Sequence, residues 1–80
     1  MTHTEFWDIV DQAFPNGLGR SLAQDLVLPE LGSRTAVVAL AQNEDPQLVW
    51  HALRVAMDLP DGYEFLHRIT GKERNKFLHP

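Results

Sequence analysis

Histidine is the residue type in this sequence that most readily supports acid–base chemistry or metal binding. The four histidines are His3, His51, His67 and His79. No two of them are four residues apart, the spacing that places two zinc ligands on one face of a helix. Glu64 and His67 form half of a carboxylate–histidine metal motif, and the chain has no second half. We therefore expect surface histidines and no metal site.

Nucleophilic catalysis has equally few candidates. Cysteine is absent, and neither Ser21 nor Ser33 lies in the Gly-x-Ser-x-Gly turn of serine hydrolases. The carboxylates of Glu5, Asp8 and Asp11 share the polar side of a helical pattern, where solvation is their ordinary role. No nucleophile, base and orienting group come together at nearby positions. The sequence thus predicts a protein that is not an enzyme and that uses no cofactor.

Gly17-Leu18-Gly19 is the segment closest to a phosphate-binding loop. Paired glycines before a helix can present backbone N–H groups to an anion. No strand precedes this segment, however, and no Gly-Lys-Ser/Thr follows it. We interpret it as conformational freedom at a helix start, with anion binding as the alternative.

Helical periodicity runs through most of the chain, and no strand-like alternation persists. Thr2 and Glu5 have the spacing of a capping box, and Asp45-Pro46 combines an N-cap acid with proline at the first helical position. The sequence predicts an all-α fold, a compact bundle of four helices around the central fourth helix. Asp61-x-x-Glu64 could cap a short fifth helix. The predicted helices span 3 to 14, 18 to 28, 35 to 42 and 46 to 58, within a helical domain at 1–60 and a C-terminal extension at 61–80 with a frayed end.

The fourth predicted helix is apolar around most of its circumference. Trp50, like Trp7, is expected to be a packing anchor rather than a ligand platform. In the second helix, Leu18 and Val27 are among the residues expected to face inward. The fourth helix leaves only a narrow polar stripe, formed by Gln47, His51, Arg54 and Asp58.

Charge is unevenly distributed along the chain. The whole sequence carries a net charge of −4. Residues 1–60 hold three arginines against eight acids, a net of −5, whereas residues 61–80 hold four basic groups against three acids, a net of +1. Because phosphate neutralisation drives nucleic-acid affinity, we expect no specific binding to duplex DNA. The lack of cysteine, signal peptide and long apolar run indicates a cytoplasmic monomer that does not enter a membrane.

Six short segments of this sequence form one set: Thr4-Glu5-Phe6-Trp7, Asp25-Leu26-Val27-Leu28, Leu31-Gly32-Ser33-Arg34-Thr35, Ala39-Leu40, Asp45-Pro46 and Val49-Trp50-x-Ala-Leu53. In their order and spacing they resemble a small bacterial family catalogued as domain of unknown function 3046. The resemblance implies a small helical cytoplasmic protein without an established activity, whose members tend to be encoded near recombination genes. This chain departs from the family pattern at His51 and Arg54, where we expect arginine and cysteine, and in its extension after Pro60.

Two surfaces are candidates for partner binding. The first is the polar stripe, whose ordinary interpretation is the solvated face of a helix. The second is the extension, whose apolar residues alternate with basic ones. Its ordinary interpretation is that these apolar residues dock on the domain. The leading hypothesis is a non-enzymatic module that binds an unidentified protein through Gln47, His51, Arg54 and Asp58. The alternative is an auxiliary nucleic-acid factor linked to recombination or repair. The apolar residues of the extension are Phe65, Leu66, Ile69, Phe77 and Leu78.

Overall fold

The fold was analysed in a computed structural model, which describes residues 1–69 and residue 73. The α-helices are α1 (His3–Ala13), α2 (Leu18–Asp25), α3 (Ala36–Ala41) and α4 (Pro46–Ala56). Three 3-10 helices accompany them: η1 (Pro15–Gly17), η2 (Pro29–Leu31) and η3 (Asp61–Arg68). Two short strands complete the order, β1 (Val27–Leu28) and β2 (Arg34–Thr35). The predicted frayed end, with Phe77, Leu78 and His79, lies outside the described residues.

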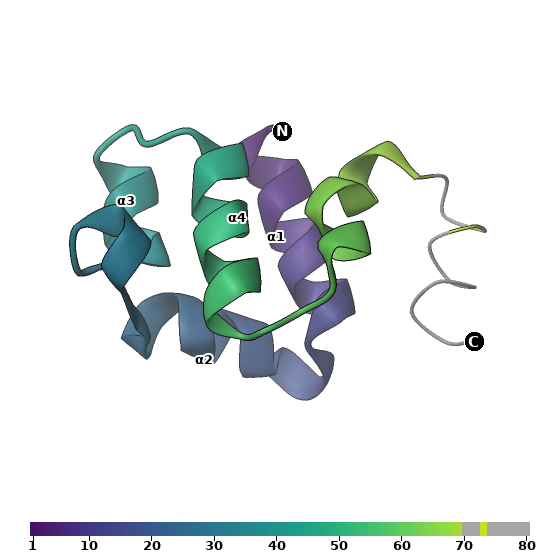
Figure 1. Ribbon diagram of the computed structural model, residues 1–80, viewed down its shortest axis with the longest axis horizontal. Coiled ribbons are helices and arrows are strands. Elements are labelled where there is room, and N and C mark those ends of the chain that lie inside the picture. The colour runs from purple at the N-terminus through teal and green to yellow at the C-terminus, as the bar shows by residue number, and fades with distance from the viewer. Residues whose placement is uncertain (70–72, 74–80) are drawn as a thin grey trace.

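The helices form a compact globule in which α4 packs against α1, α3, η2 and η3. In Figure 1, α4 runs across the front of the molecule, with η2 and α3 on one side and η3 on the other, while α2 crosses one end. The structure is mostly helical, as predicted. A bundle arranged around the fourth helix stays a prediction.

The predicted caps at Thr2 and Asp45 form at the starts of α1 and α4. The Thr2 hydroxyl accepts a hydrogen bond from the Glu5 backbone N–H at 3.1 Å, and the Glu5 carboxylate accepts one from the Thr2 backbone N–H at 2.9 Å. Thr35 caps α3, and Asp45 caps α4 by accepting from the Gln47 N–H at 3.0 Å. These bonds satisfy backbone donors that have no partner inside a helix.

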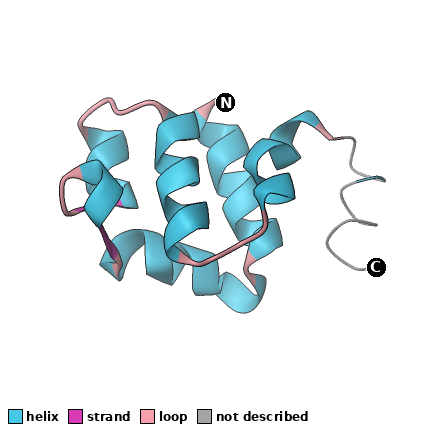
Figure 2. Cartoon of the chain, in the orientation of Figure 1, coloured by secondary structure: helices cyan, strands magenta, loops and turns pink. Residues whose placement is uncertain are grey.

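The strictly all-α prediction is wrong at the end of the second helix. That helix ends at Asp25, and Val27–Leu28 instead pairs antiparallel with Arg34–Thr35, as the magenta segments in Figure 2 show. Pro29 disfavours helical geometry at the residue before it, so the chain is already extended at Leu28.

Two residues that were expected to face inward are half exposed, namely Leu18 and Val27. Successive residues of an extended segment point to opposite sides, so Leu28 enters the core and Val27 faces away from it. Leu18 begins α2 directly after the left-handed residue Gly17, at the end of the helix where fewer neighbours cover it. A helical wheel extended through 18–28 could not reveal either outcome.

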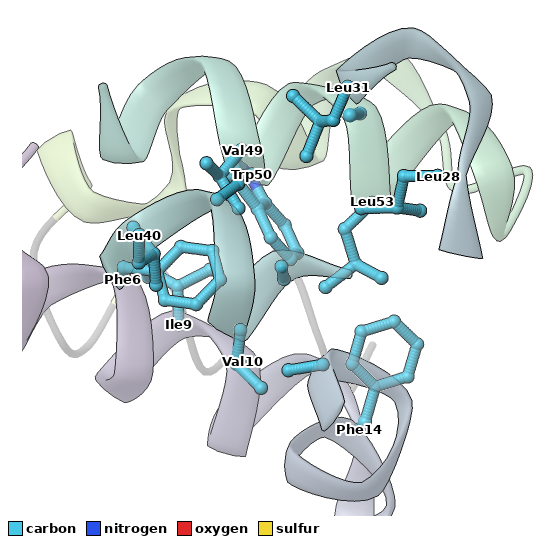
Figure 3. Close-up of a cluster of buried hydrophobic side chains, with 14 of the residues drawn as sticks. Phe6, Ile9, Val10, Phe14, Leu28, Leu31, Leu40, Val49, Trp50 and Leu53 are labelled. Carbon is cyan, nitrogen blue, oxygen red and sulfur yellow. The ribbon is translucent and has the colours of Figure 1, made fainter. Parts of the chain in front are cut away.

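The core gathers apolar side chains from every α-helix. Figure 3 shows Trp50 of α4 among Val49, Leu53 and the side chains of α1. The Phe6 ring meets the Trp7 ring edge-on at a centroid distance of 5.1 Å, so Trp7 packs at the margin. Trp50 is fully buried, as expected for a packing anchor. The largest fully buried side chains are Trp50, Phe6, Ile9, Leu28, Leu53, Leu66, Val10 and Val49.

Gly19 lies where α2 crosses closest to α1. A Cβ atom at this position would lie 2.5 Å from Val10 Cγ1 and 2.7 Å from the Val10 carbonyl oxygen. Gly17 has a φ of +76°, which fits the predicted freedom at a helix start. Gly19, by contrast, is required by packing between the two helices.

Gly19→Ala is therefore expected to destabilise the fold strongly. The added methyl overlaps a helix carbonyl that cannot rotate away, which places the loss near the upper end of the overpacking range, about 3 kcal/mol. Urea unfolding followed by helical circular dichroism measures this difference. Ser21→Ala, at an exposed position of the same helix, is the matched control and is expected to be near neutral. Equal stability of the two variants contradicts the prediction.

Candidate functional site

Three of the four residues of the predicted polar stripe come together beneath η3. Gln47, His51 and Arg54 succeed one another at helical spacing along α4, and each contacts Glu64 of η3. We call these three side chains the Glu64 clamp. Asp58 lies outside it, in the turn that follows α4.

The Glu64 carboxylate receives contacts from every member of the clamp. Its Oε1 accepts from Arg54 Nε at 2.9 Å and lies 2.6 Å from His51 Nδ1, and its Oε2 accepts from Gln47 Nε2 at 3.0 Å. Burial raises the pKa of this carboxyl, but hydrogen bonds from His51, Arg54 and Gln47 outweigh burial and hold it below its ordinary value. The clamp therefore binds the ionised form of Glu64.

Arg54 is the buried charge of this site. Its side chain is only 10% exposed, and that of Glu64 only 15%. The guanidinium also donates to the Leu59 carbonyl oxygen at 3.0 Å and to Asp61 at 3.2 Å. The expectation of a solvated stripe is thus wrong at Arg54, because the chain after α4 folds back over it.

Two further contacts seat η3 on α4. The Trp50 indole N–H donates to the Tyr63 carbonyl oxygen at 2.9 Å, and Gln47 Nε2 also donates to the Glu64 carbonyl oxygen at 3.0 Å. Leu66 is fully buried in the core. The predicted cap at Asp61-x-x-Glu64 does not form, since η3 has no side-chain cap and Glu64 turns to α4 instead.

Asp58 has a backbone role at the end of α4. It adopts a left-handed conformation with a φ of +54°. Its N–H donates to the Val55 carbonyl, and the Leu59 N–H donates to the Arg54 carbonyl. These two bonds form a Schellman motif, which ends the helix and directs the chain toward η3.

A partly exposed strip of α4 lies beside the clamp. The exposed fractions are 43% for Leu48, 42% for Val55 and 41% for the His51 side chain, which lies between them. These three residues follow one another at intervals of three and four, so they share one side of the helix. We call them the α4 strip. His51 Nε2 lies 3.6 Å from a carboxylate oxygen of Glu30 in η2, so His51 stands between two carboxylates.

An exposed aromatic residue lies on η3. The Phe65 side chain is about half exposed, and the Arg68 guanidinium stacks over its ring at 4.7 Å from the centroid. A similar pair occurs on α1 and α2, where Arg20 stacks on Trp7 at 4.9 Å and bonds both carboxylate oxygens of Asp11. That contact uses one of the acids that the sequence placed on a solvated helix face.

The remaining candidates stay separate. Within residues 1–69 and 73, no group of three His, Asp or Glu side chains is arranged to hold a metal ion. In the same part of the chain, no helix combines the length and the apolar character that spanning a membrane requires. Sequence reasoning missed Glu64 as the centre of the clamp. The sequence feature that points to Glu64 is an acid two residues after the Asp61-Gly62 turn, where the chain reverses onto the helix that has just ended.

A protein-family model matches most of this chain. The model of the family described as "Protein of unknown function (DUF3046)" matches residues 1–62, which include α1, α2, α3 and α4. Comparison with curated proteins and with solved structures found no match. The family match includes Asp61 and ends just before Tyr63 and Glu64, two further residues of η3 that bond to α4. Since it covers more than half of the 80 residues, it confirms the resemblance noted in the sequence, and the chain belongs to this family of unknown function.

Proposed function

We propose that this protein is a non-enzymatic module that binds another protein through the α4 strip. The observation that carries the proposal is the partial exposure of Leu48, His51 and Val55 along one side of a helix whose other sides are packed. Single exposed apolar residues are ordinary, but two that flank a polar residue on one helix face form a continuous contact surface. An apolar groove on a partner would bury such a face.

The neighbours of the strip have the chemistry of an interface margin. Glu30 lies on one side of His51, and the clamp with η3 lies on the other. On η3, the Phe65 ring stacked by Arg68 pairs two residue types that are enriched in protein interfaces relative to the rest of the surface. We therefore expect the partner to contact the α4 strip and Phe65 with Arg68. Arg54 is no longer an expected contact residue, because its guanidinium is covered by η3.

The test replaces the apolar residues of the strip and leaves the clamp intact. Leu48→Gln/Val55→Gln is compared with Leu18→Gln/Val27→Gln, which removes two equally exposed apolar side chains from α2 and β1. Both variants are first checked for unchanged helical circular dichroism and melting. Partners are then captured from a lysate of the native cell and quantified by mass spectrometry.

The amount of each specific partner captured by the strip variant is expected to fall about tenfold or more. A tenfold loss of affinity is equivalent to about 1.4 kcal/mol of binding free energy. The control variant should retain them. If the folded strip variant keeps every specific partner, α4 is not the binding surface and the proposal is wrong.

A further inference from the structure

The side of α4 that faces η3 holds this short segment of the same chain through three different features. The clamp holds a carboxylate, the Trp50 N–H holds the carbonyl oxygen of the residue before it, and the core takes the leucine two residues after it. This combination of side-chain charge, backbone carbonyl and apolar anchor is how protein surfaces select linear segments.

The segment that fills this surface has little structure of its own. η3 is a 3-10 helix, whose hydrogen-bond geometry is poorer than that of an α-helix, and Phe65 interrupts it with a φ of −117°. Asp61 and Phe65 are exposed, and the segment is held by its packing against α1 and α4 and by the burial of Leu66. It follows α4 through the left-handed residue Asp58 and through Pro60, a short connection at which it can turn away.

A segment that covers the clamp must supply a carboxylate. Arg54 is enclosed because η3 lies over it, and a guanidinium that is enclosed again without a carboxylate is strongly unfavourable. A segment that displaces η3 must therefore bring its own carboxylate. This requirement makes the exchange selective for an acidic side chain at one position.

We infer that the Glu64 clamp is a binding site for a glutamate-bearing segment of a protein partner, and that Glu64 occupies it as an internal substitute. The inference rests on the proposed protein-binding function and names the chemistry of the partner. The partner segment carries a glutamate followed two residues later by leucine or a similar apolar residue, as Glu64 and Leu66 do. Because residues 1–60 carry a net charge of −5, the residues that follow the glutamate are neutral or basic, as His67 and Arg68 are after Glu64.

The experiment uses the full chain with its internal substitute weakened. In Glu64→Lys, a like charge faces Arg54 and should expel η3 from the clamp. The probe is a fluorescent peptide with the sequence of residues 59–69, and a second peptide carries glutamine in place of the glutamate. Fluorescence anisotropy measures binding of each peptide to the wild-type and variant chains.

The variant chain is expected to bind the glutamate peptide at least about tenfold more tightly than the wild-type chain does. The glutamine peptide should bind the variant at least about tenfold more weakly than the glutamate peptide. Equal binding by the two chains, equal binding of the two peptides, or no binding to a folded variant overturns the inference. Reciprocal exchange of η3 in a wild-type dimer, detected by light scattering, would make the occupant a second copy and would also overturn it.

Native-state hydrogen exchange of the wild-type chain keeps the inference testable if Glu64→Lys fails to fold. Amides of residues 61–69 should exchange through a local opening that leaves α1 and α4 protected. Exchange of these amides only on global unfolding would make η3 a fixed part of the fold and contradict the inference. If the α4 strip variant loses its partners but no chain binds the peptide, the proposed protein-binding function is supported and the inference about the clamp is wrong. Peptide binding to the clamp, together with a strip variant that keeps every partner, would retain the clamp as a binding site and reject the α4 strip.

Discussion

Replacing Trp50 by alanine is expected to lower the free energy of unfolding by about 3–5 kcal/mol. The indole is fully buried in the core (Figure 3), and its N–H is bonded to the Tyr63 carbonyl oxygen at 2.9 Å. The substitution thus creates a cavity and also removes a hydrogen bond that seats η3. A domain of this size has roughly 4–12 kcal/mol of stability in total, so most of it could be lost.

Denaturant unfolding measures this loss, with two companion variants. Trp50→Phe keeps an aromatic ring but removes the N–H donor, so its stability should lie between wild type and Trp50→Ala. Leu48→Ala, on the exposed side of the same helix, should have a much smaller effect. A Trp50→Ala protein as stable as wild type would show that the packing described for α4 is wrong.

Arg54→Ala is expected to remove about 3 kcal/mol of stability. It leaves the Glu64 carboxylate largely enclosed beside only His51 and Gln47, and it frees the Leu59 carbonyl oxygen from its donor. Arg20→Ala is the matched control, since Arg20 pairs with Asp11 in the open, where ion pairs contribute little. A loss for Arg54→Ala no larger than that for Arg20→Ala contradicts a buried clamp.

The same ion pair has a predictable dependence on pH. Because the folded protein holds the pKa of Glu64 below its ordinary value of 4.5, Glu64 stabilises the fold above that pH. The contribution is lost as the pH falls through the lowered folded value, when both states bind the proton equally. Stability curves should therefore fall less steeply in acid for Glu64→Gln than for wild type.

Features that depend on neighbouring residues could be predicted from the sequence. The caps at Thr2 and Asp45 need only residues two or three positions away, so their patterns identified two helix starts correctly. Helical periodicity likewise placed Gln47, His51 and Arg54 on one face of α4, because the rotation per residue is fixed by the backbone.

Features that depend on distant residues could not be predicted in this way. Gly19 is required by the approach of Val10 from another helix, which no local pattern shows. Leu26 already has extended backbone angles at the end of α2, and the strand that follows finds its partner only after η2 has turned the chain back. That long-range pairing replaced the last turn of the predicted helix.

The sequence by itself thus determined the helices, their starts and the grouping of the polar residues on α4. Only the tertiary structure decided that Arg54 is enclosed and that Glu64, ten residues farther along the chain, supplies its carboxylate. The physical reason is that a helical wheel gives the direction of a side chain but not what lies in that direction. Cover by η3 depends on the turn at Asp58 and on the burial of Leu66, two events that are settled only when the whole chain packs.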